Sequence, residues 1–171
     1  MPTKHDLFIT FGLILFFVHS WAIYRYLYEI PSFLLYMNIT QIISIFAYMM
    51  AFAFIESILT CTIISGLCSI LPVKNSWVGF VPRAFCMLIV AILVSINFMD
   101  TLPSKYPGLN FLLFRMFIAA GIFIILLLII YFLKPVQRFV VFVAEQVSVM
   151  VYIFTPIGVI SIFVVLFRIL I

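Results

Sequence analysis

Long apolar stretches make up most of this chain, and polar residues gather in short breaks between them. About five stretches approach or reach the length of about 20 mainly apolar residues that a transmembrane helix needs. These expected spans are residues 6–28, 43–71, 82–99, 110–133 and 149–170. The pattern predicts an all-α integral membrane protein whose residues 1–171 form a single multi-pass membrane domain.

The first expected span has recognisable signals at both ends. Thr3 and Asp6 have the spacing of a capping box, which starts a helix by satisfying its early backbone N–H groups. Pro31 is expected to end the helix, because proline removes a backbone donor. The small residues Ser20 and Ala22 loosely resemble a signal-peptide cleavage site, but we expect this segment to be the first membrane helix.

Residues 32–71 are ambiguous, since they are too many for one upright span and no glycine or proline interrupts them before Gly66. Their few polar residues near the start share one arc of a helical wheel, and these are Asn38, Thr40, Gln41 and Ser44. Such one-sided polarity favours a short interfacial helix over residues 32–42 that bends into the span. Two closely spaced spans, with these polar residues in the turn, are the alternative.

A second interfacial helix is expected over residues 136–148. Polar side chains fall mainly on one half of its wheel and apolar side chains on the other, the polar set being Lys134, Gln137, Arg138, Glu145, Gln146 and Ser148. Val141 and Phe142 interrupt the polar half. A helix with this pattern is typical of the lipid headgroup region.

Composition supports the membrane assignment and limits the partners. The chain is 68% hydrophobic and 8% charged, and its net charge of +4 comes from nine scattered Lys and Arg residues. Soluble domains are about 45–50% apolar and 25% charged. No cluster of basic residues indicates nucleic acid. Basic residues are weakly biased toward the loops on the N-terminal side, so we expect the N-terminus inside, in the cytoplasm, and the C-terminus opposite.

Glu56 is the strongest polar candidate, because charged groups inside a bilayer are costly and therefore functional by default. Thr60 lies one turn away, and an adjoining face carries small residues that allow close helix contact. The candidates for interhelical polar contact are Glu56, Ser57, Thr60, Cys61, Ser65, Cys68 and His19. We favour interhelical hydrogen bonding for Glu56 over a proton or ion relay, since no second acidic residue lies at similar depth.

His19 has three interpretations: a proton carrier, a cofactor ligand or a hydrogen-bonded packing residue. We favour packing, because the other histidine, His5, lies near the terminus and cannot complete a bis-histidine site at membrane depth. Cys61, Cys68 and Cys86 lie in apolar stretches and are expected to pack as small hydrophobic residues. We predict no metal site and no cofactor, although bound lipids are expected.

A further set of residues is expected at the lipid headgroup level, where aromatic and basic side chains favour the interface. This set is Trp21, Arg25, Trp77, Arg115, Lys134 and Arg138. Arg25 and Glu29 have the spacing of a helical ion pair. For Arg115 we favour a pair with Asp100 over a lipid phosphate, and we expect Arg168 to reach the interface without forming a site.

No Walker A motif, dinucleotide fingerprint or metal-type Cys/His spacing occurs. The favoured function is a small, non-catalytic accessory subunit of a larger membrane protein assembly, with other membrane subunits and lipids as partners and no soluble substrate. The alternative is a self-sufficient carrier or lipid-binding protein that uses Glu56, His19 and Arg115. A membrane enzyme ranks third, because no nucleophile, base and charge stabiliser can be assembled from this sequence.

Overall fold

A computed structural model describes residues 3–70, 79–99 and 109–170 of the chain. The described residues form six helices, in agreement with the predicted all-α class. The helices are α1 (Lys4–Tyr36), α2 (Ile39–Ile70), α3 (Phe80–Met99), α4 (Leu109–Phe132), α5 (Lys134–Ser148) and α6 (Val151–Leu170).

Three of these helices are long and apolar enough to cross a membrane within the described residues: α1, α2 over Ile39–Cys68, and α6 over Val151–Arg168. The chain is thus consistent with a helical integral membrane protein. This count differs from the expected five spans. The expected span 82–99 corresponds to α3, whose apolar part Phe80–Val94 is shorter than a membrane span. The expected span 110–133 corresponds to α4.

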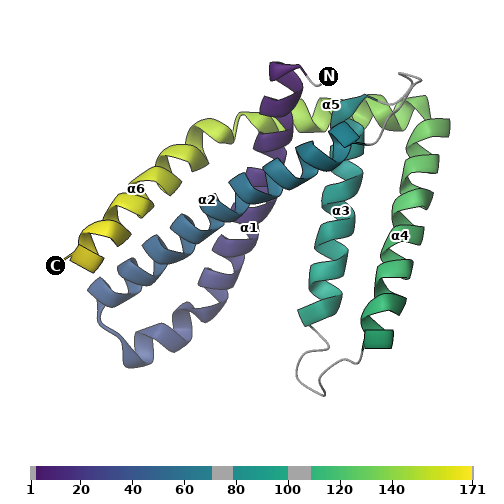
Figure 1. The fold of residues 1–171 in the computed structure, drawn as a ribbon. Coiled ribbons are helices and arrows are strands. Elements are labelled where there is room, and N and C mark those ends of the chain that lie inside the picture. The colour runs from purple at the N-terminus through teal and green to yellow at the C-terminus, as the bar shows by residue number, and fades with distance from the viewer. Residues whose placement is uncertain (1–2, 71–78, 100–108, 171) are drawn as a thin grey trace.

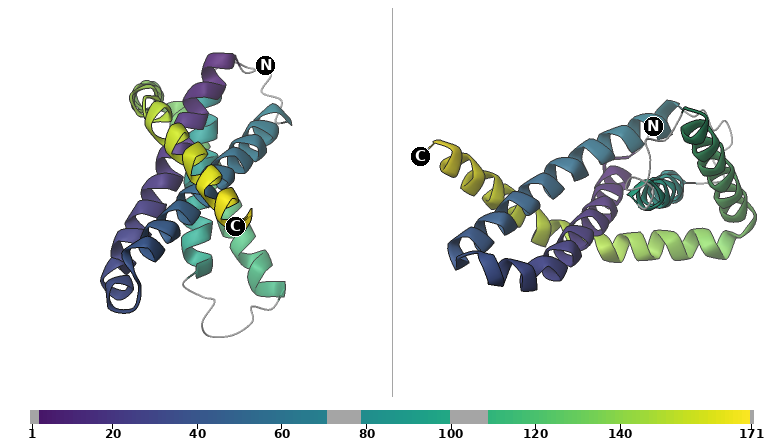
Figure 2. Two further views of the ribbon diagram at one scale, coloured as in Figure 1. Left: turned by 90° about the vertical axis from the view of Figure 1, so that its left-hand side faces the viewer. Right: turned by 90° about the horizontal axis from the view of Figure 1, so that it is seen from below.

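The helices have a clear arrangement in space. Helices α1, α2 and α6 pack together, α3 and α4 lie side by side, and α5 lies across one end of α3 and α4 (Figure 1). Helix α6 crosses α2 at an angle (Figure 2). Helices α3 and α5 both contact α1, so the α3–α4 pair is joined to the group formed by α1, α2 and α6.

The start of α1 is as predicted, and its end is not. Thr3 Oγ1 accepts a hydrogen bond from the Asp6 backbone N–H at 3.1 Å, and Asp6 Oδ2 accepts from the Thr3 backbone N–H at 3.0 Å, which completes the capping box. The helix continues through Pro31 to Tyr36. A proline removes one helical hydrogen bond, whereas ending the helix in an apolar medium would leave several backbone groups unsatisfied.

The expected interfacial helix at residues 32–42 is wrong, because a turn between α1 and α2 lies within this segment. Residues 32–36 belong to α1, and α2 begins at Ile39 instead of residue 43. Asn38 forms the start of α2: its carbonyl accepts from the Gln41 N–H at 2.9 Å, and its own N–H donates to Gln41 Oε1 at 3.0 Å. Asn38 and Gln41 therefore cap the start of α2 directly after a tight turn.

The buried core lies where α1, α2, α3 and α5 meet. Its main cluster consists of Ile9, Leu13, Ile14, Ile64, Cys68, Val81, Ala84, Leu88 and Ala144. Two glycines permit close packing between helices. A Cβ atom at Gly12 would lie 2.6 Å from the Cα of Ser148, and one at Gly158 would lie 2.6 Å from Cγ of Phe54. Gly12 thus lets α1 pack closely against the turn between α5 and α6, and Gly158 lets α6 cross close to α2.

Helix α5 is formed by the residues for which the second interfacial helix is expected. It buries Val140, Ala144 and Ser148 and exposes Arg138, Glu145 and Gln146. Phe139, placed on the apolar half of the wheel, is nevertheless exposed. The buried strip is therefore narrower than the sequence pattern suggests, and α6 begins at Val151 instead of residue 149.

Candidate functional site

The two faces of α2 differ in their surroundings. One face packs inside the chain and includes Met50, Ala53, Phe54, Ser57 and Ile64, all of which are buried. The opposite face, which we call the Glu56 face, consists of the exposed residues Phe52, Ile55, Glu56, Leu59 and Ile63. A helix repeats every 3.6 residues, so these five side chains lie on one side. No other described helix of the chain covers them.

Glu56 lies near the middle of α2 and is exposed on this face. Within the described residues, no hydrogen bond or ion pair reaches its carboxyl group, and none joins it to Thr60. Its surroundings are the apolar side chains of the Glu56 face. In a membrane this arrangement leaves a carboxyl group among lipid chains unless another molecule meets it.

The small residues of α2 lie on the inner side of the helix. Ser57 is completely buried and donates to the carbonyl oxygen of Ala53 at 2.7 Å. Cys61 Sγ lies 3.9 Å from Ser65 Oγ, and Cys68 Sγ lies 3.6 Å from Met87 Sδ of α3. These residues are therefore part of the packing between helices of this chain, on a different side of α2 from Glu56.

His19 is completely buried in α1. Its ring stacks on Phe154 of α6 with a centroid distance of 4.9 Å, and Nδ1 lies 3.0 Å from the carbonyl oxygen of Leu15. Among the residues that the structure describes, Nε2 has no hydrogen-bond partner. The structure therefore places His19 in the α1–α6 contact, apart from exposed Glu56, whereas the side chain of Arg115 lies outside the described residues.

The expected interface residues are exposed where they are described, namely Trp21, Arg25, Lys134 and Arg138. The predicted pair of Arg25 and Glu29 is confirmed, with Nη2 and Oε1 3.4 Å apart. Both side chains are nearly half exposed, so the pair contributes at most a few tenths of a kcal/mol. Trp77 and Asp100 lie outside the described residues.

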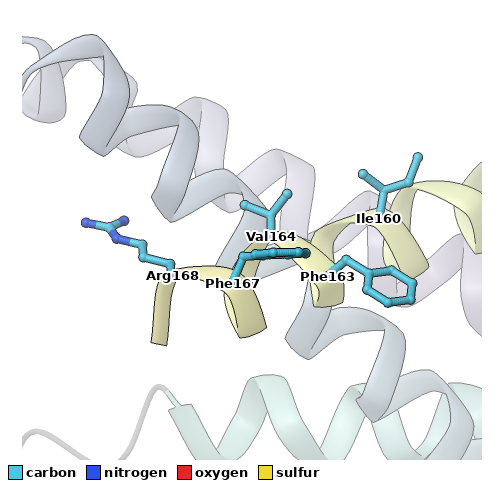
Figure 3. A pocket seen from close by; sticks show the side chains of 5 residues that line it. All are labelled: Ile160, Phe163, Val164, Phe167 and Arg168. Atoms are coloured by element: carbon cyan, nitrogen blue, oxygen red, sulfur yellow. The ribbon is translucent and has the colours of Figure 1, made fainter. Parts of the chain in front are cut away.

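A hollow on α6 was not assigned from the sequence. It has a volume of about 680 Å³ and is lined by Ile160, Phe163, Val164, Phe167 and Arg168 (Figure 3). Their spacing of three and four residues places them on one side of the helix. The signal available in the sequence was an apolar stripe of this spacing that ends in a basic residue.

The described residues contain no group of three or more His, Cys, Asp or Glu side chains that could hold a metal ion. Comparison with protein-family models, curated proteins and solved structures finds no match to this chain.

Proposed function

We propose that this chain is a small, non-catalytic accessory subunit of a larger membrane protein assembly, and that the Glu56 face receives a helix of another subunit. The observation that carries the proposal is the position of Glu56, exposed in the middle of α2 among apolar side chains. A charge at the centre of a membrane helix costs about 2.5–3.5 kcal/mol on insertion scales. A partner that bonds to the carboxyl group offsets this cost.

The chemistry of Glu56 limits the partner. A carboxylate accepts hydrogen bonds and prefers a positively charged or amide donor. The partner is therefore a transmembrane helix that carries a basic or amide side chain at mid-membrane depth, with apolar side chains against Phe52, Leu59 and Ile63. Polar side chains that bond across helices are one of the main sources of association in lipid.

We further propose that helices α1, α2, α3, α4 and α6 cross the bilayer, that α5 lies at its surface, and that the N-terminus is cytoplasmic. The supporting observations are the side-by-side packing of α3 and α4 and the position of α5 across their ends (Figure 1). Reporter fusions to the two termini test this arrangement, which requires that they report opposite sides.

Purification of the tagged chain from its native membrane in mild detergent tests the proposed function. We expect partner subunits in fixed stoichiometry with the wild type, their loss with Glu56→Leu, and partial retention with Glu56→Gln, whose amide still forms hydrogen bonds. Glu145→Leu removes an exposed carboxyl group of α5 instead and is expected to keep the partners. Purification of the wild type alone, or equal retention by Glu56→Leu, would contradict the proposal.

A photo-crosslinking residue at Leu59 locates the contact. Leu59 belongs to the Glu56 face, whereas Leu166 is an equally apolar exposed position on α6. We expect one discrete adduct with another subunit from position 59 and none from position 166. An adduct containing only two copies of this chain would show that the Glu56 face serves self-association instead.

A further inference from the structure

The hollow on α6 combines an apolar wall with a single charged end. Its lining residues recur along the helix from Ile160 to Arg168, and the side chains project from one side of α6 (Figure 3). Eight residues of α-helix correspond to about 12 Å. One leaflet of hydrocarbon is about 15 Å thick, half of the bilayer core. The hollow is therefore long enough for the upper part of one lipid acyl chain.

The neighbours of Arg168 indicate its depth in the membrane. Its guanidinium carbon is 6.0 Å from the ring centroid of Tyr48 in α2. Two residues before Tyr48, the ring of Phe46 packs against Tyr26 of α1 at 5.0 Å between centroids. Tyr26 belongs to the aromatic end of α1 that includes Trp21 and Tyr24, and such rings favour the headgroup region. These aromatic neighbours indicate that Arg168 lies at the level of the lipid phosphates.

The guanidinium group is available for that phosphate. Arg168 is exposed, and within the described residues it forms no ion pair. Its guanidinium group makes a cation–π contact with the Tyr48 ring. Arg25, at a similar depth, is already paired with Glu29. A guanidinium group presents paired donors that match the oxygens of a phosphate.

The lining favours a lipid over a protein helix. Contacts between membrane helices are enriched in small residues that let the backbones approach. On α6 the small residues Gly158 and Ser161 are buried toward the rest of the chain. The hollow instead presents Phe163 and Phe167, whose bulky rings hold a neighbouring backbone away but leave space for a flexible acyl chain.

We propose that this hollow binds an anionic glycerophospholipid, with the phosphate at Arg168 and one acyl chain along Ile160, Phe163, Val164 and Phe167. This site does not depend on the Glu56 face or on the accessory function, because it lies on a different helix. A net negative headgroup is preferred over a zwitterionic one, since choline partly neutralises the phosphate that Arg168 binds.

Native mass spectrometry of the full chain, released from nanodiscs with equal amounts of dioleoyl phosphatidylglycerol and dioleoyl phosphatidylcholine, tests the site. The wild type is expected to retain phosphatidylglycerol with about fivefold preference, which corresponds to the attraction of one basic residue to a net negative lipid surface. Arg168→Gln is expected to lose the preference, and Arg168→Lys to keep part of it. Phe167→Ser is expected to lower the amount of both lipids.

Arg25→Gln is the matched control, because it removes an exposed, paired arginine at similar depth, and the preference should persist. An unchanged preference in Arg168→Gln would overturn the proposal, and so would an equal loss in Arg25→Gln, which would indicate general attraction to basic residues. Soluble glycerophosphate is expected not to displace the lipid. Its displacement of the lipid would refute the role of the acyl chain.

Discussion

Gly12→Ala is expected to destabilise the chain by separating α1 from the corner between α5 and α6. The added methyl group would lie 2.6 Å from the Cα of Ser148 and 3.0 Å from Cγ2 of Val151. Carbon atoms prefer contacts of about 3.5–4.0 Å, so the corner must move by about 1 Å. Because the Cα of Ser148 belongs to the backbone, no side-chain rotation relieves the contact.

The expected change in the free energy of unfolding follows from two opposing effects. Alanine is favoured over glycine within a helix by about 0.8–1.0 kcal/mol, whereas overpacking typically costs about 1–3 kcal/mol. A gap of about 1 Å also removes a quarter to a half of the dispersion energy between facing atoms, and the completely buried Ala144 lies in this region. We therefore expect a net loss of about 1–2 kcal/mol, which lowers Tm by about 2–8 °C.

The buried thiols of Cys68 and Cys86 provide the assay. A thiol-reactive fluorescent dye, added to the purified chain in mild detergent, reports unfolding as these groups become accessible on heating. Gly66→Ala is the control, because a methyl group there meets nothing within 4 Å, and its Tm should equal or exceed that of the wild type. A Tm for Gly12→Ala at or above that of Gly66→Ala would show that the added methyl group does not overpack the contact with Ser148.

The same assay tests two further variants, and hydrogen exchange tests a third. Gly158→Ala places a methyl group 2.6 Å from Cγ of Phe54 and should lower Tm by a few degrees, as overpacking costs about 1–3 kcal/mol; a Tm no lower than that of Gly66→Ala would contradict this. His19→Ala empties a completely buried, stacked position and should cost about 2–4 kcal/mol, by analogy with large-to-small core substitutions. An unchanged Tm would show that His19 does not contribute to packing. Thr3→Ala removes half of the capping box and should cost about 1 kcal/mol, detectable as faster hydrogen exchange in the first turn of α1; unchanged exchange would show that the cap does not stabilise this end.

Local features of the chain were predictable because they depend on residues close in sequence. The capping box of Thr3 and Asp6 and the ion pair of Arg25 and Glu29 each involve side chains within one turn of a helix. The all-helical class follows from long apolar stretches that must satisfy their own backbone hydrogen bonds in lipid.

The end of α1 was less predictable, because two local signals compete there. Pro31 favours a helix end, and the polar arc of residues 38–44 favours a surface helix. The structure continues α1 to Tyr36 and uses Asn38 and Gln41 to start α2. Tyr26 Oη donates to the carbonyl oxygen of Ile42 at 3.1 Å, a contact between α1 and α2 that helps hold the turn. Such a contact joins residues that no helical periodicity relates.

The long apolar stretches are enough to predict a helical chain suited to a membrane, with a carboxyl group at Glu56 in the middle of an apolar segment. Helix packing is needed to show that Ser57 faces inward while Glu56 faces outward, and that Arg168 lies at the end of an exposed hollow. The physical reason is the solvent. In water, apolar periodicity marks the buried face of a helix, but in lipid both faces of a helix are apolar. Only the packing of helices distant in sequence then determines which side chains face a neighbour within the chain and which remain open to lipid or another subunit.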